Sequence, residues 1–499
     1  MRNHGWLARS IALLAGIALT SCTVGPDYVR PTVDVPAAWR IDYPKASEVA
    51  NTRWWKQFGD PALDDLIDAT LHENRDIRIA AARVDQFAGG LQATRSQLYP
   101  QVGYGADTTR TRQSRVGPTP IPDPFSNYFT IYQGSLAAQW QIDLFGRVQR
   151  LSEAAQAQVY ASEQAKRGVV LTLVAGVATS YIFLRALDRQ LEIAQSTAAN
   201  FGETKRIFEL RFRAGLVSQT EVSQITSQYQ QALASIPVFR QAIAAQENSI
   251  SVLTGRNPGP IARGKTIDAL MAPLIPADVP SAVLERRPDV LQAEQNLVAA
   301  NANIGAAKAL YFPTISLTGL LGSVSTAFGN FLTGPAATWG LIGGVTGPIF
   351  TAGGIEGQVR SAEGGERAAL AFYQQTMLGA LRETNDALVG SQQKIDELAM
   401  QTLRVQALRE FARLSRLRFD KGIASYLDVL VAENELFAAE IANVRVLSER
   451  YAQVVAVYQA MGGGWVDIAT RMAPQPQGVP SPVQSQAFNA GFGNLGSAK

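Results

Sequence analysis

Two long windows without proline constrain the fold of this chain more than any other feature of its sequence. Residues 125–236 and 349–473 contain no proline, and each window holds a segment compatible with one uninterrupted helix, at residues 146–212 and 354–419. At 1.5 Å rise per residue, each helix would reach roughly 100 Å. Few globular domains accommodate such a helix, so the pattern predicts a long coiled coil or a tube of helices. Along the second segment, apolar residues recur at three- and four-residue steps: Met400, Leu403, Ala407, Phe411, Leu414 and Leu417.

One uncharged stretch in the first long helix resembles a membrane span. Residues 168–184 read GVVLTLVAGVATSYIFL. The stretch is shorter than the ~20 residues that a span usually needs, and threonine, serine and glycine dilute it. We therefore predict a helix that its neighbours bury on most sides.

A period-two pattern precedes each long helix and predicts four strands. It runs near residues 101–112 and 127–143, and more weakly near 314–325 and 337–350. Each segment has about the length of a tilted strand that crosses a bilayer. Four strands cannot close a membrane barrel and an open edge is not tolerated in lipid, so the barrel would be shared between chains. The residues expected on its outward face are Tyr128, Thr130, Tyr132, Leu136, Ala138, Trp140, Ile142, Ile315, Leu317, Leu321, Trp339 and Leu341. A soluble sheet that caps a helical protein is the alternative.

The N-terminus indicates export and so favours the membrane interpretation. Residues 1–21 combine a basic start, an uncharged apolar stretch and small residues, as a secretory signal peptide does. Leu-Thr-Ser then precedes Cys22, the single cysteine of the chain, and resembles a bacterial lipobox. In proteins with a lipobox, the cysteine is acylated and the signal peptide is cut just before it. The residue after the cysteine is Thr23 and not Asp, which in such proteins favours sorting to the outer membrane. An ordinary signal peptide with an incidental cysteine is the alternative.

Composition argues against catalysis and against nucleic-acid binding. Without residues 1–21 the chain keeps one histidine, His72, which is too few for a Ser-His-Asp triad or a histidine-rich metal site. The signal peptide carries two of the 45 basic residues and none of the 42 acidic ones, so the mature charge is close to +1. Such a balance gives no electrostatic footprint for nucleic acid. We expect no enzyme activity and no metal site.

The chain also contains a tandem repeat. RFRAGLVSQTEV at 211–222 is echoed by RFDKGIASYLDV at 418–429, which predicts two similar hairpins around a common axis. The predicted domains are a signal peptide at 1–21, an extended lipidated segment at 22–61, repeat 1 at 62–258, a linker at 259–281, repeat 2 at 282–465 and a disordered tail at 466–499.

Several motifs, in matching order along the chain, resemble those of the TolC-like outer-membrane efflux channels, closest to the lipidated OprM/NodT branch. They are CTVGPDYVRP at 22–31, WWKQFGDPALDDLI at 54–67, the stretch 285–317 that begins ERRPDV, GPIFTAGG at 347–354 and MGGGW at 461–465. The resemblance implies a mainly α fold with a membrane β-barrel. In that fold a homotrimer forms a twelve-stranded barrel, four strands per chain, on a long periplasmic coiled-coil tunnel. It also implies a periplasmic adaptor and an inner-membrane pump of the RND type as partners. The location implied is the outer membrane, with the lipid on Cys22 and no other cofactor.

The turns between long and short helices carry a recurring pattern. Gly215 and Gly422 suit the left-handed position that ends a helix. Each is followed by Ser-x-x-acid, a capping box that would open the next helix and would engage Glu221 and Asp428.

The resemblance implies a periplasmic gate at these turns, with the second repeat on the inner side. Three copies of Asp428 would form a carboxylate ring, and Leu427 an apolar constriction beside it. Val431 stands where many relatives carry a further acid, so we expect a thinner ring and a more hydrophobic seal. Glu221 is the candidate for a second carboxylate at the tip, with a purely capping role as its alternative.

The function implied is the outer-membrane channel of a tripartite efflux system that exports drugs and other toxic small molecules. The alternatives are a type I protein-secretion channel and a structural envelope protein that does not conduct.

Overall fold

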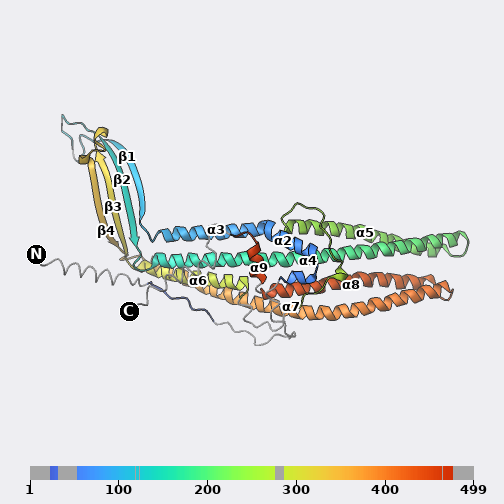
Figure 1. Cartoon of the computed structure of the whole chain (residues 1–499). Coiled ribbons are helices and arrows are strands. Elements are labelled where there is room, and N and C mark those ends of the chain that lie inside the picture. Colours follow the sequence, from blue (N-terminus) through green and yellow to red (C-terminus); the bar gives the residue numbers. More distant parts are fainter. Residues whose placement is uncertain are drawn as a thin grey trace. The chain divides into compact units, whose positions relative to one another are not determined.

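The computed structural model of the chain is mainly helical with one small sheet (Figure 1). It describes residues 23–31, 53–118, 120–122, 124–275, 286–462 and 465–475. The predicted signal peptide at 1–21 and the predicted lipidation site Cys22 lie outside the described residues.

The helices and strands follow the order that the sequence predicts. The helices are α2 Pro61–Glu73, α3 Arg75–Ser96, α4 Arg147–Arg213, α5 Gln219–Leu253, α6 Pro288–Lys308, α7 Gly354–Asp420, α8 Tyr426–Met461 and α9 Trp465–Met472. The strands are β1 Gln101–Arg112, β2 Tyr128–Ile142, β3 Thr314–Ser325 and β4 Ala337–Thr346. Helices α4 and α7 have 67 residues each, and neither contains a proline that would break its hydrogen-bond ladder.

The chain divides into two compact units, which we call unit 1 and unit 2. Unit 1 comprises Met1–Pro31, Asp85–Ala161 and Ala293–Tyr373, and unit 2 comprises Thr32–Val84, Ser162–Gln292 and Gln374–Lys499. Unit 1 therefore holds the four strands with the adjoining parts of the helices, and unit 2 holds both helical hairpins.

In unit 1 the strands form one antiparallel sheet in the order β1-β2-β3-β4. The central pair joins the two repeats, because β2 pairs with β3 although they lie far apart in the sequence. Strand β4 ends at Thr346, earlier than the predicted boundary near 350. Pro348 explains the difference, since proline has no N–H to donate to a sheet ladder.

The N-terminal stretch 23–31 is held in place within unit 1. The Val24 N–H donates to the Phe145 carbonyl at 3.3 Å. The buried guanidinium of Arg150 pairs with Asp27 at 2.8 Å. Gly25 lies so close to the backbone of Gly305 that an added Cβ would come within 2.4 Å of the Gly305 Cα. This contact requires glycine.

The core of unit 2 is built around a cluster of buried aromatic rings. Trp54 stacks on Tyr458 with ring centroids 5.2 Å apart, and it makes a T-shaped contact with Trp465 at a centroid distance of 5.8 Å. Trp55 also contacts Trp465, at 5.9 Å, and all three tryptophans have no exposed surface. Residues from both ends of unit 2 thus share one core.

Helix α9 corrects the prediction of a disordered tail that starts at residue 466. Residues 465–472 are helical, and Val466 and Ala469 are buried beside Trp465. The prediction failed there because the Pro- and Gln-rich composition begins only after Ala473, and the preceding residues can bury an apolar face. Residues 476–499 lie outside the described part of the chain.

Helix α4 is the one described helix that is long and apolar enough to cross a membrane by length and composition. Its most apolar window is 61% buried inside the protein, and Val174, Val177 and Tyr181 are completely buried in the core of unit 2. The prediction that residues 168–184 are a core helix buried on most sides is confirmed.

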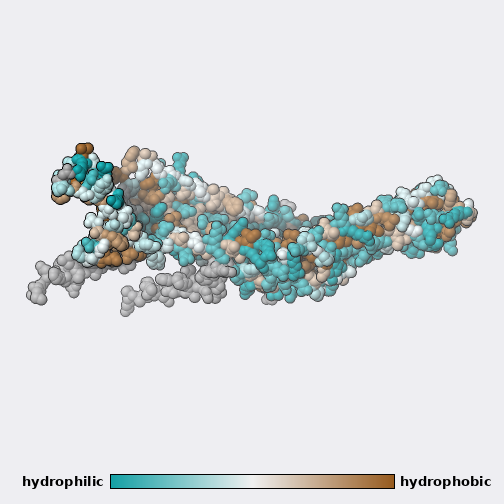
Figure 2. Space-filling view, turned by 90° about the horizontal axis from the view of Figure 1, so that it is seen from above, coloured by the Kyte–Doolittle hydropathy of each residue, from teal (hydrophilic) through white to brown (hydrophobic). Residues whose placement is uncertain are grey.

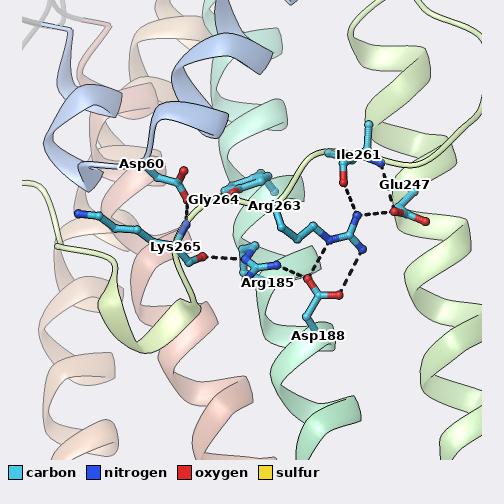
Figure 3. Close-up of polar contacts among 9 residues, drawn as sticks. Asp60, Arg185, Asp188, Glu247, Ile261, Arg263, Gly264 and Lys265 are labelled. Atoms are coloured by element: carbon cyan, nitrogen blue, oxygen red, sulfur yellow. Dashed lines mark hydrogen bonds and ion pairs between the residues drawn. The ribbon is translucent and has the colours of Figure 1, made fainter.

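Within unit 2, buried polar contacts fasten the linker after α5 to the start of α2 and to α4 (Figure 3). Asp60 is completely buried at the N-cap of α2, and its Oδ1 accepts from the Ala62 N–H at 3.0 Å. Its Oδ2 accepts from the Lys265 N–H at 2.9 Å and from the Tyr181 hydroxyl at 2.8 Å. That hydroxyl accepts in turn from the Gly264 N–H at 3.0 Å.

A second contact fastens the same linker. The Arg263 guanidinium donates to both carboxylate oxygens of Asp188, at 3.0 and 3.2 Å, and also pairs with Glu247 (Figure 3). Since Asp188 lies on α4 and Glu247 on α5, Arg263 ties the linker to both helices of the first hairpin.

Replacing Asp60 should loosen this linker. In Asp60→Asn one side-chain oxygen becomes an NH₂ group, so one set of donors loses its acceptor, at a cost of about 1.5–3 kcal/mol. We expect proteolytic cleavage within residues 256–275 to become about 10- to 150-fold faster under conditions where cleavage follows local opening. Asp65→Asn is the matched control, because Asp65 is exposed on the same helix. Equal cleavage rates in both variants would contradict the assignment.

Candidate functional site: the sheet faces and the hairpin tips

One face of the sheet is apolar along its whole width. Tyr104 lies opposite Leu136, Leu136 opposite Leu321, and Leu321 opposite Trp339, so these four side chains form one row. Tyr104 and Trp339 are 90% and 82% exposed in the single chain. The register gives the same face to all of the residues predicted to point outward: Tyr128, Thr130, Tyr132, Leu136, Ala138, Trp140, Ile142, Ile315, Leu317, Leu321, Trp339 and Leu341.

The opposite face is rich in polar side chains and glycine. One row contains Gln101, Gln139 and Thr318 and ends in Ile342, and another contains Asp107, Gln133 and Val324. Asp107 is the single ionisable side chain on this face of the described strands. Such a face suits water and small solutes, whereas the apolar face suits hydrocarbon.

Both outer strands have one unpaired edge. Strand β1 pairs only with β2, and β4 pairs only with β3, within the described part of the chain. Their outward N–H and C=O groups need partners wherever water is absent. A second copy of the chain can supply them.

At the other functional region, in unit 2, both hairpin turns have the geometry that the sequence predicts. Gly215 and Gly422 each adopt φ +73°, the left-handed conformation that favours glycine. At each turn the glycine N–H donates to the carbonyl three residues earlier, and the next N–H donates to the carbonyl five residues earlier. This pair of bonds is the Schellman motif, which ends a helix sharply.

The two predicted capping boxes have different outcomes. Ser218 and Glu221 form the complete box: Glu221 accepts from the Ser218 N–H at 2.7 Å, and Ser218 accepts from the Glu221 N–H. The second prediction is wrong, because Ser425 makes no side-chain cap. The Asp428 N–H, which the Ser425 side chain would cap, donates instead to the Ser425 carbonyl at 3.3 Å.

A small aromatic core joins the two hairpins near their tips. Phe208 of α4 lies 4.2 Å from Tyr426 of α8 between ring centroids, and Phe419 of α7 lies 5.1 Å from Tyr426. Phe208 also stacks on Phe419 at 5.8 Å. Val429 and Leu430 of α8 are buried in the same cluster, so one face of α8 is firmly held.

The predicted gate residues lie on the other face of α8. Leu427 is 55% exposed and Val431 is 45% exposed, and Asp428 is exposed between them. The spacing of one and four residues puts the three side chains on one side of the helix. Glu221, by contrast, is engaged in the capping box on α5.

Sequence reasoning missed a polar cluster behind these residues. Arg416 of α7 lies 3.6 Å from Glu433 of α8 and donates to the Thr204 hydroxyl of α4 at 3.5 Å. Burial raises the pKa of the Glu433 carboxyl above its usual value, and the nearby Arg416 only partly opposes this shift. No sequence motif marks the cluster, because its members come from three different helices.

Comparison with known proteins gives a consistent result. A family model described as outer membrane efflux protein matches residues 66–256 and 279–463. The probable efflux pump outer membrane protein TtgC of Pseudomonas putida is 33% identical over 484 residues, which cover 95% of this chain and 98% of TtgC. The cation efflux system protein CusC of Escherichia coli is 30% identical over 455 residues, covering 90% of this chain and 97% of CusC.

Solved structures agree with these sequence matches. The open state of the MtrE outer membrane channel of Neisseria gonorrhoeae superimposes with a TM-score of 0.81 at 28% identity, over 89% of this chain and 99% of that one. The fold and the sheet thus define an outer-membrane channel protein. The chain belongs to the outer membrane efflux protein family, and the TolC-like fold predicted from the sequence is confirmed.

Proposed function

We propose that three copies of this chain form one channel whose barrel has twelve strands, four from each copy, and which exports toxic small molecules across the outer membrane. The observation that carries the proposal is a sheet with one apolar face and two edges that no other described strand pairs with. Pairing β1 of one copy with β4 of the next would satisfy both edges and close the barrel.

An uncovered apolar stripe on α7 supports the assembly of several copies. Met400, Leu403, Phe411, Leu414 and Leu417 are all more than 40% exposed in the single chain. Figure 2 shows hydrophobic residues among hydrophilic ones over the surface of the long hairpins. Such a stripe at helical spacing is what a coiled-coil neighbour covers.

The cargo and the partners follow from the same proposal. The polar face of the sheet would line the lumen with glutamine, serine and threonine, which favours no single kind of small solute. TtgC is named as part of an efflux pump and CusC as part of a cation efflux system. We infer a periplasmic adaptor and an inner-membrane pump of the RND type as partners, with the pump selecting the substrate.

The gate of the channel is assigned to the exposed face of α8 at the hairpin tips. Three copies of Leu427, Asp428 and Val431 would converge there, with Asp428 supplying a ring of negative charge. The buried aromatic core on the opposite face of α8 would hold this ring in position.

A lipid on Cys22 would add a second attachment to the membrane. Thr23, the next residue, lies against Gly146, where an added Cβ would approach the Thr23 side chain to 2.8 Å. Gly146 follows the end of β2 and precedes α4. The acyl chains would therefore enter the inner leaflet beside the helical end of the sheet.

The trimer prediction is tested by native mass spectrometry of the purified protein and by conductance in a planar bilayer. We expect a trimer that conducts. Leu414→Asn should lower the temperature at which the trimer dissociates, because it places an amide in the apolar stripe. Arg413→Asn is the matched control on the adjacent exposed position. A monomer or dimer that conducts would refute the shared barrel. A trimer that does not conduct would indicate a structural protein. Passage of folded or unfolded polypeptide through the channel would indicate protein secretion.

The gate prediction concerns ion selectivity. Asp428→Asn removes three charges per trimer at little steric cost, so the closed channel should show weaker cation preference and weaker block by divalent ions. Leu427→Ser should instead wet the constriction and raise the resting conductance. Asp420→Asn, at the end of α7 in the same hairpin, is the control and should behave as wild type. Wild-type selectivity in Asp428→Asn recordings would overturn the assignment.

The lipid prediction concerns the mature N-terminus. Mass spectrometry of the N-terminal peptide should find acylated Cys22 as the first residue, and Cys22→Ser should yield an unlipidated chain. Thr23→Ser keeps the lipobox and should remain lipidated. We expect the unlipidated channel to conduct, since the barrel itself spans the membrane. An unmodified Cys22 in the wild-type protein contradicts the proposal.

A further inference from the structure

Two arginines stand out on the apolar face of the sheet. Arg112 lies opposite Tyr128 in the register, and Arg110 lies opposite Thr130, so both point to the face that carries Leu136 and Trp339. They are the only ionisable acids or bases other than tyrosine on this face of the described strands. Both arginines are exposed.

Both guanidinium groups lie near one aromatic ring. The Cζ atom of Arg112 is 5.6 Å from the centroid of the Tyr128 ring, and that of Arg110 is 5.9 Å from it. These distances are within the range of cation–π contacts. Neither arginine forms an ion pair with a carboxylate among the described residues, and Asp107, on the same strand, points to the opposite face. The two positive charges are therefore held together and are left available.

The position of Arg110 and Arg112 along their strand places them relative to the membrane. Gln101 begins β1 next to the helical end of the sheet, and Arg112 ends it at the loop that leads to β2. Strands rise about 3.4 Å per residue and tilt by about 40° in barrels, so the arginines lie roughly 25 Å from Gln101 along the membrane normal. The apolar band of a membrane barrel is about 25 Å tall. The pair thus falls at the outer edge of this band, at the level of lipid headgroups.

We propose that Arg110 and Arg112, seated on Tyr128, bind the phosphate groups of an anionic lipid in the outer leaflet. This inference rests on the proposed function, which turns the apolar face toward lipid. Guanidinium groups bind phosphate oxygens with paired hydrogen bonds. Tyrosine is enriched at the membrane interface, where its ring stays among acyl chains and its hydroxyl reaches the headgroups.

The experiment counts the lipids retained by the full-length trimer. The trimer is reconstituted in nanodiscs of phosphatidylcholine with a minor fraction of a diphosphorylated glycolipid, released into detergent and weighed by native mass spectrometry. The double variant Arg110→Gln/Arg112→Gln should retain at most about one third as many glycolipid molecules as the wild type. The double variant Arg110→Lys/Arg112→Lys should retain an intermediate number, because lysine keeps the positive charge but cannot form the paired hydrogen bonds. Arg404→Gln/Arg413→Gln removes the same charge from exposed positions on α7 and should retain glycolipid as wild type does.

Three results would overturn the proposal. Equal retention by the Arg110/Arg112 glutamine variant and the wild type would mean that the arginines are merely solvated. An equal loss in the α7 control would mean that net charge alone acts. Displacement of the glycolipid by millimolar inorganic phosphate would indicate a site for free phosphate instead of lipid. Conductance is recorded in parallel, and its preservation in all variants keeps failure of this proposal distinct from failure of the channel assignment.

Discussion

The rest of the structure depends on the outward backbone groups of β1 and β4, which have no partner strand in the described part of the chain. In lipid each unsatisfied N–H or C=O group costs several kcal/mol, because no water replaces the missing partner. The sheet exposes aromatic and aliphatic side chains on one face, so it cannot simply remain in water either. Membrane insertion and pairing with further copies are therefore linked. Lipid covers the apolar face of the sheet, and further copies supply the hydrogen-bond partners that lipid cannot supply.

The length and the sharp ends of the helical hairpins come from simple local features of the sequence. Their length comes from two helices without internal proline, and their sharp ends come from glycine in the left-handed conformation at residues 215 and 422. At the tips, α8 has one face fixed by Phe208 and Phe419 and another face left exposed with Leu427 and Asp428. Because one face of α8 is held by packing, each copy of the chain can present the same exposed residues toward a common axis. A selective constriction formed by several copies needs this fixed geometry.

Distant parts of the sequence are fastened together by a few buried groups. Trp54 and Trp55 from the N-terminal side meet Trp465 from the C-terminal side in the core of unit 2. Asp60 and Arg263 secure the linker between the repeats through buried or partly buried charges, each of which has its hydrogen-bond partners. Removing one partner from such a group is costly, so these contacts fix one arrangement of the linker.

The sequence by itself determined the elements, because proline, glycine and hydrophobic period act locally. It predicted the long helices within a residue or two, the strands with their apolar face, the two glycine turns and the Ser218–Glu221 cap. Only the tertiary structure decided that β2 pairs with β3, that Ser425 lacks its cap, that residues 465–472 are helical, and that Arg416, Glu433 and Thr204 meet. Those outcomes depend on side chains and strands that come together from separate parts of the chain, and the periodicity of one segment carries no information about its partner.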